Sequence, residues 1–177
     1  YSWNMLFRNR ELDRAFDFIS KSDFDIFCLQ EVPEAFLKRL QTLPCRIAYR
    51  SDVERLFAHD IERNFVVILS KHRISAQGEI PFPDYWHLLP LRTRIFVRLM
   101  WPFYFSKITN RGGLYADIPM GGMPVRVFNL HLILAQPAWR LKEFEMAMAK
   151  RNSSVPTIVC GDFNTIEAPH ISILNWL

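Results

Sequence analysis

Apolar and polar positions follow a regular order along the first part of the chain. Residues 2–6 have the pattern of a short strand, and residues 25–31 form an apolar run that ends in polar residues, as an interior strand does. Between them, residues 10–22 place four apolar side chains on one helix face: Leu12, Ala15, Phe16 and Ile19. This order predicts a β-α-β unit.

The alternation continues towards the middle of the chain. Pro33 is predicted to open a helix that ends before Pro44, and its apolar face consists of Ala35, Phe36, Leu37 and Leu40. A charged connection then leads to residues 64–70, a run rich in β-branched residues that predicts a strand. Residues 77–91 contain several prolines and are expected to form a loop or an edge strand.

The second half is predicted to contain further strands, a hairpin and a helix. Residues 93–99, 113–118 and 125–132 have strand patterns, and the glycine pair before the last of these predicts a tight antiparallel hairpin. Residues 137–150 form a predicted helix with an apolar face of Leu141, Phe144, Ala147 and Met148. Residues 157–160 are predicted to form a buried strand. We therefore expect a mixed sheet packed with helices in layers.

The composition is that of one globular domain. Half of the 177 residues are apolar and 23% are charged, and the net charge of +4 is compatible with an anionic substrate without indicating one. The three cysteines argue against a disulfide framework and slightly favour a reducing, cytoplasmic compartment. No run reaches the roughly 20 apolar residues that a membrane-spanning helix needs. The sequence gives no indication of the oligomeric state.

Polar side chains stand near the ends of the predicted strands. The set consists of Asn4, Glu31, Asn129, His131, Asp162 and Asn164. Asn129 and His131 share one face of an extended backbone, because successive side chains alternate. Asp162 and Asn164 have the same spacing. Polar pairs of this kind beside apolar runs are typical of a site at the rim of a sheet, and carboxylates without clustered cysteines favour a hard cation such as Mg²⁺.

Each of these residues taken singly also has an ordinary structural interpretation. A glutamate at a strand end is more often solvated or paired with a cation than bound to a metal. An Asp-x-Asn segment more often forms a turn, because these side chains bond their own backbone. A histidine can contact a phosphoryl oxygen in either protonation state. Only the ordered combination of the residues indicates phosphate chemistry.

That combination resembles the endonuclease/exonuclease/phosphatase superfamily, the DNase I-like metal-dependent phosphoesterases. The matching segments are SWN, FCLQEV, FVVILSK, VRVFNLHL and IVCGDFNT, in the order and approximate spacing of the superfamily over residues 2–165. No single motif is decisive, and the ordered set carries the resemblance. The resemblance implies an α/β fold, a four-layer α/β sandwich in which helices flank two packed mixed or antiparallel sheets.

The resemblance also implies roles for the matched residues. Glu31 would be the principal ligand of Mg²⁺ or Mn²⁺, and Asn4 would be its neighbour in the metal site. His131 would contact the scissile phosphate. Asp162 would orient or activate the attacking water, and Asn164 would hold a phosphoryl oxygen or the nucleophile.

Two further residues and one departure from the superfamily pattern remain. Asn129 and Arg111 are candidate phosphate-binding residues, although an exposed loop arginine is an equally good interpretation of Arg111. Members normally continue into further strands and a Ser-Asp-His element, which the residues after Asn164 do not match. We therefore expect residues 1–177 to form a single domain that lacks its C-terminal strands.

Three functional hypotheses follow. The first is a hydrolase of phosphodiester or phosphomonoester bonds, with a nucleic acid, a phospholipid or an inositol phosphate as substrate. The second is a non-catalytic binding module that keeps the fold. The third is a lipid-directed, sphingomyelinase-like phosphodiesterase, in which residues 99–107 (LMWPFYFSK) form an aromatic loop at a membrane interface. A buried strand with its turn is the favoured interpretation of that run.

Overall fold

Two β-sheets packed face to face form the centre of the protein. The computed structural model describes residues 1–56, 61–84, 91–100, 107–134 and 136–165. The first sheet contains, in spatial order, β1 (Ser2–Asn4), β2 (Ile26–Pro33), β4 (Ile61–Ser70), β3 (Arg46–Leu56) and β6 (Lys107–Thr109). The second contains β5 (Ala76–Pro81), β7 (Gly112–Met120), β8 (Met123–His131) and β9 (Thr157–Asp162). Both sheets are mixed, because β1 and β2 are parallel, as are β8 and β9.

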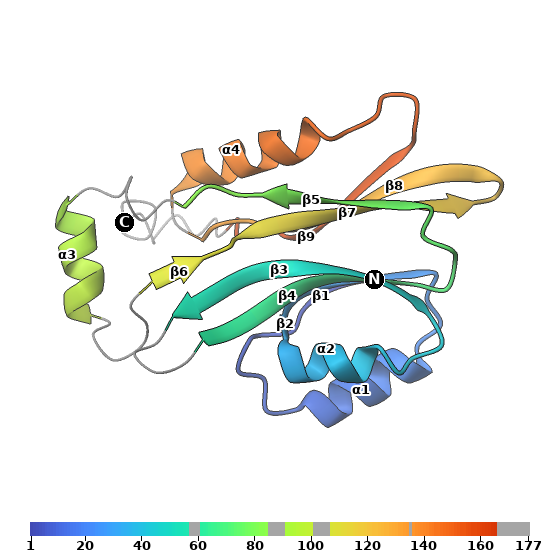
Figure 1. The fold of residues 1–177 in the computed structure, drawn as a ribbon, viewed down its shortest axis with the longest axis horizontal. Helices are drawn as coiled ribbons and strands as arrows, with labels where there is room; N and C mark the ends of the chain where they lie inside the picture. Colours follow the sequence, from blue (N-terminus) through green and yellow to red (C-terminus); the bar gives the residue numbers. More distant parts are fainter. Residues whose placement is uncertain (57–60, 85–90, 101–106, 135, 166–177) are drawn as a thin grey trace.

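Helices cover the outer face of each sheet (Figure 1). The helices α1 (Leu12–Lys21) and α2 (Glu34–Leu40) lie on the first sheet, and α4 (Pro137–Met148) lies on the second. Three apolar layers hold the four structural layers together. Ile19 and Phe36 pack beneath the first sheet, Ile68 and Ile118 pack between the sheets, and Ala147 packs against the outer face of the second. The predicted four-layer α/β sandwich is confirmed.

The predicted local connections are also confirmed. Strands β1 and β2 pair in parallel with α1 between them, as a β-α-β unit requires. Strands β7 and β8 form the predicted antiparallel hairpin, in which Gly121 and Gly122 have φ angles of 58° and 85°. These angles lie in the left-handed region that glycine enters without a steric penalty.

Four sequence predictions are wrong. The strand predicted to be buried at residues 157–160 is β9, an edge strand of the second sheet that has no fully buried residue. Residues 93–99 belong to a helix, α3 (Leu91–Met100), and not to a strand, because Leu91, Ile95 and Leu99 also satisfy helical spacing. The charged connection before residue 64 contains strand β3, whose charged side chains hid the strand pattern. In α4, Leu141 is 58% exposed. The residues that α4 buries completely are Ala147, as predicted, and Glu143, which was not predicted.

The remaining predictions about the connecting segments are settled only in part. Strand β5 lies at the edge of its sheet, in agreement with the expected loop or edge strand in residues 77–91, although residues 85–90 lie outside the described residues. The aromatic run of residues 99–107 falls mostly on residues 101–106, which also lie outside them. Within the described part of the chain, no helix has the length and hydropathy needed to cross a membrane.

Candidate active site

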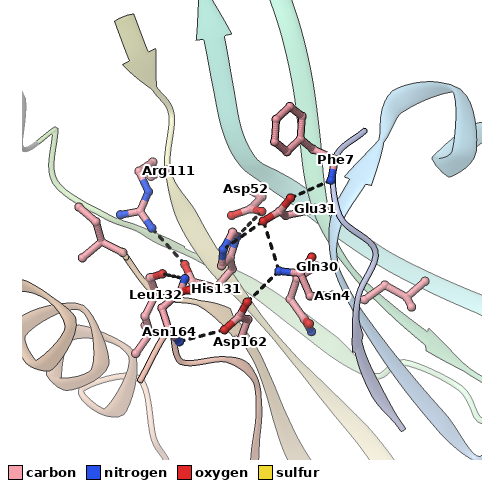
Figure 2. Close-up of polar contacts among 12 residues, drawn as sticks. Asn4, Phe7, Gln30, Glu31, Asp52, Arg111, His131, Leu132, Asp162 and Asn164 are labelled. Atoms are coloured by element: carbon pink, nitrogen blue, oxygen red, sulfur yellow. Dashed lines mark hydrogen bonds and ion pairs between the residues drawn. The ribbon is translucent and has the colours of Figure 1, made fainter. Parts of the chain in front are cut away.

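Four polar side chains converge where strands of both sheets end (Figure 2). Asn4 ends β1, Glu31 lies near the end of β2, and His131 and Asp162 end β8 and β9. The parallel pairing explains the convergence, because the carboxyl ends of parallel neighbours meet at the same edge of a sheet. In the registers of the structure, Asn4 pairs with Gln30 and His131 pairs with Asp162. Face-to-face packing then brings the two edges together.

The amide of Asn4 joins the two carboxylates across the gap between the sheets. Its Nδ2 atom donates to Glu31 Oε1 at 3.2 Å and to Asp162 Oδ2 at 2.8 Å. Its Oδ1 atom accepts from the backbone N–H of Leu6 at 2.8 Å, and the second oxygen of Glu31 accepts from the N–H of Phe7 at 2.8 Å. Asn4 therefore holds both carboxylates from the nitrogen side of its amide, and its oxygen is directed to the backbone.

Unusual backbone conformations are concentrated at this rim. Glu31 has φ of 55° and lies at a bulge of β2, where the register with β4 shifts between Leu29 and Val32. Asn164 has φ of 50°, and Gly161 has φ of 138° in a position where an added Cβ would lie 1.8 Å from a backbone oxygen. A non-glycine residue in such a region costs about 1–3 kcal/mol and persists only where the surrounding structure enforces it. Enforced strain of this kind is typical of functional sites.

His131 is held by a buried aspartate that the sequence analysis missed. Its Nδ1 atom lies 2.7 Å from Asp52 Oδ2, and its Nε2 atom lies 3.6 Å from Glu31 Oε1. Burial disfavours the charged imidazolium, but the negative charge of Asp52 and its hydrogen bond outweigh this effect, and the pKa of His131 is raised. Nδ1 is thus occupied by Asp52, and Nε2 is the ring atom that faces the carboxylates.

Two charged residues from β3 belong to the site and had no recognisable local signal. Asp52 is 1% exposed, and its Oδ1 atom has no hydrogen-bond partner within the described residues. The guanidinium of Arg55 lies 4.0 Å from the centre of the Phe7 ring. Burial lowers the pKa of Arg55, and the charges of Glu31, Glu62 and Asp52 oppose that shift. Both residues lie in the segment that was interpreted as a charged connection.

Arg111 supports the rim from behind. Its guanidinium is paired with Glu143 of α4 and donates to the carbonyl oxygen of His131 at 3.1 Å. The other carboxylate oxygen of Glu143 accepts from the N–H of Ile133 at 2.7 Å. Burial raises the pKa of Glu143, and Arg111 opposes that shift. This pair fixes the backbone where β8 ends, and the guanidinium of Arg111 is engaged by protein groups.

The side-chain amides of Asn129 and Asn164 also donate hydrogen bonds to protein groups. Asn129 is fully buried between the sheets, where its Nδ2 atom donates to the carbonyl oxygens of Leu29 and Val67. Asn164 donates from its side chain to the carbonyl oxygen of Leu132 at 2.7 Å, and its backbone N–H donates to Asp162 Oδ1 at 2.9 Å. The geometry gives Asn129 a structural role, and we do not propose it as a phosphate ligand. Asn164 holds Asp162 in place.

The donor atoms at the rim suit a hard divalent cation. They are carboxylate oxygens of Glu31 and Asp162, with no cysteine among them, and the side chain of Glu31 is 14% exposed. Among the residues that the structure describes, no three acidic, histidine or cysteine side chains are grouped as a metal site. Mg²⁺ does not require such a group, because it is usually held by one or two carboxylates together with water and substrate oxygens.

Comparison with known families identifies the family of the chain. The family model described as "Endonuclease/Exonuclease/phosphatase family" matches residues 1–169. The chain belongs to this family. The comparison with curated proteins gave no significant match. The family model therefore establishes family membership, and the likeness to individual proteins is seen in solved structures.

Several solved structures share the fold at low sequence identity. An endonuclease/exonuclease/phosphatase family protein from Leptotrichia buccalis is 16% identical with a TM-score of 0.59, and the match covers 87% of this chain and 60% of that one. A humanized TDP2 from D. rerio is 13% identical with a TM-score of 0.62, and the match covers 97% of this chain and 68% of that one. Sphingomyelinase C from Streptomyces griseocarneus is 17% identical with a TM-score of 0.61, and the match covers 93% of this chain and 63% of that one. The chain thus spans 60–68% of the length of these three proteins.

Proposed function

We propose that this protein is a metal-dependent phosphoesterase that hydrolyses a phosphodiester or phosphomonoester by in-line attack of water. The observation that carries the proposal is the convergence of Glu31, Asp162 and His131 at one rim, with Asn4 clamping the two carboxylates. Family membership and the likeness to a sphingomyelinase fold support the same class of reaction. A divalent ion such as Mg²⁺ or Mn²⁺, when bound, would polarise the phosphoryl group.

The side chains divide the remaining work. Glu31 is the proposed anchor of the cation, with Asp162 on the opposite side of Asn4. Asp162 is held by one hydrogen bond on each oxygen, from Asn4 and from the Asn164 N–H, so that it is oriented to accept a proton or a hydrogen bond from water. His131, oriented through Nδ1 by Asp52, which also raises the pKa of its ring, directs Nε2 towards a phosphoryl oxygen. Arg55 adds positive charge beside Glu31.

The test is hydrolysis of bis-p-nitrophenyl phosphate in Mg²⁺. Glu31→Gln and Asp162→Asn are each expected to lower kcat/KM roughly a thousandfold, because residues that act as a unit lose most of their joint effect together. The matched control is Glu145→Gln, which removes an exposed carboxylate from α4 and should leave turnover unchanged. Undiminished turnover in both site variants would refute the assignment.

A binding measurement separates metal binding from chemistry. Mn²⁺ binding, followed by the relaxation of water protons, is expected to weaken about tenfold or more in Glu31→Gln and to stay unchanged in Glu145→Gln. Equal Mn²⁺ affinity in the parent protein and in Glu31→Gln would exclude Glu31 as the anchor. Mn²⁺ binding without any turnover in the parent protein would favour the non-catalytic binding module instead.

A further inference from the structure

Two cysteines from different sheets meet in the apolar layer between the sheets. Cys28 lies in β2 and is fully buried, and Cys160 lies in β9, is partly buried and packs against the same apolar cluster. Both are free thiols in the structure. A hydrogen bond joins the two side chains, and together with burial it raises the pKa of Cys28. A lone buried thiol is an inert apolar group, whereas two thiols in contact are a candidate disulfide.

The backbone around these two cysteines is already tied together across the sheets. In the register of β8 and β9, Cys160 lies opposite Asn129. The side chain of Asn129 crosses to the first sheet and donates to the carbonyl oxygen of Leu29, the residue after Cys28, at 2.9 Å. Strands β2 and β9 also contact each other directly. Because a disulfide forms only where the two backbones are already close, the folded protein can accommodate this bond without rearranging its sheets.

The third cysteine has a different environment. Cys45 packs against the apolar cluster beneath the first sheet, on the face that α1 and α2 cover. The first sheet therefore separates Cys45 from the layer that contains Cys28 and Cys160. Burial raises the pKa of Cys45. This cysteine serves as an internal reference for the reactivity of the other two.

We propose that Cys28 and Cys160 are an oxidation site, at which hydrogen peroxide converts two adjoining thiols into a reversible disulfide between the sheets. The sulfur of Cys160, the more exposed of the two, attacks one peroxide oxygen. The O–O bond breaks, and the departing hydroxide takes the thiol proton and leaves as water. The sulfur of Cys28 then attacks the sulfenic sulfur of Cys160, the S–O bond breaks, and a second water leaves with the Cys28 proton. The two thiols lose two electrons, and the peroxide gains them.

The disulfide would link the two strands that carry the candidate carboxylates. Cys28 precedes Glu31 in β2 by three residues, and Cys160 precedes Asp162 in β9 by two. A transient disulfide is typical of redox-sensing proteins in reducing compartments. Its formation does not depend on the proposed hydrolysis, and it is measured without a substrate or a metal.

The test is oxidation of the whole folded chain by hydrogen peroxide, followed by alkylation of the remaining thiols and mass spectrometry of the peptides. The parent protein should lose two of its three free thiols, yield a peptide pair linked through Cys28 and Cys160, and regain all three thiols in dithiothreitol. In Cys160→Ser, oxidation of Cys28 should slow about tenfold or more, because the more exposed sulfur is gone. In Cys28→Ser, Cys160 should stop at the sulfenic acid, which dimedone labels.

The matched control is Cys45→Ser, in which the linked peptide pair should form as in the parent protein. Circular dichroism checks that all three variants are folded. A linkage to Cys45, a linkage between two chains, or two separate thiols at Cys28 and Cys160 after oxidation overturns the proposal. So does undiminished oxidation of Cys28 in Cys160→Ser, and an unlabelled Cys160 in Cys28→Ser overturns the order of attack.

Discussion

Two regions of β8 on the same face of the strand have opposite characters. Asn129 lies in the interior between the sheets, where it is fully buried and bonded to three groups of the first sheet. His131, two residues later, lies at the rim. There Asp52 holds one ring nitrogen, and the other faces Glu31. In the interior every polar atom of the Asn129 side chain is hydrogen-bonded to protein, whereas at the rim Nε2 of His131 makes only a longer contact, 3.6 Å to Glu31 Oε1.

The interior residue also supports the rim. The two carbonyl oxygens that accept from Asn129 belong to Leu29 and Val67, which pair across β2 and β4 next to the bulge that contains Glu31. Asn129 thus reaches from the second sheet to the backbone that presents the candidate metal ligand of the first. A polar residue beside the candidate active site can thus act through the backbone without touching a substrate.

The largest expected effect on stability comes from removing the buried side-chain amide of Asn129. Asn129→Leu leaves two backbone carbonyls and the side-chain amide of Gln30 without this partner, and the free energy of unfolding should fall by about 3 kcal/mol. Urea denaturation measures the change. The control Gln41→Leu, at an exposed position, should stay within about 0.5 kcal/mol. An Asn129→Leu variant as stable as the parent would show that the interior bonds contribute nothing net.

A smaller effect is expected at the rim. Because the pKa of His131 is raised in the folded state, the stability that this histidine contributes is present below its ordinary pKa of roughly 6.5 and is lost as the pH rises through the raised value. Asp52→Asn removes the negative charge, so the pKa of His131 should fall. At pH values below the ordinary pKa of roughly 6.5, the free energy of unfolding should decrease by about 1.5 kcal/mol, because the hydrogen bond between His131 and residue 52 becomes weaker.

The measurement is an NMR titration of the His131 ring in protein freed of metal by a chelator, together with denaturation at several pH values. The control is Asp25→Asn, which breaks the exposed pair with His72. Exposed ion pairs contribute little, so this change should leave the dependence of stability on pH almost unaltered. An unchanged His131 titration in Asp52→Asn would contradict the role assigned to Asp52.

The smallest effect is expected at the far end of β8. Gly121 has φ of 58° in the hairpin, and nothing lies within 4 Å of a Cβ added there. Gly121→Ala should therefore cost only the conformational penalty of about 1 kcal/mol, as measured by thermal unfolding. Mn²⁺ binding should not change, because the hairpin is remote from the rim. Weaker Mn²⁺ binding in this variant would mean that the two ends of β8 are coupled.

Local pattern determined most of the architecture. The β-α-β unit, the glycine hairpin and the interior strands follow from side-chain periodicity, which depends only on neighbouring residues. It failed where two periods coexist, as in α3, and where charged residues line a strand, as in β3. The i, i+2 spacing also placed Asn129 and His131 on one face.

Depth and partnership were decided only by the tertiary structure. Strand periodicity gives the face of a residue but not whether that face meets another sheet or an open rim, and packing made Asn129 interior and left His131 at the edge. The partner of His131, Asp52, is 79 residues away along the chain, and no local pattern connects the two. The role of the buried Asp52 carboxylate follows from its contact with His131, and that contact exists only after the two sheets have packed.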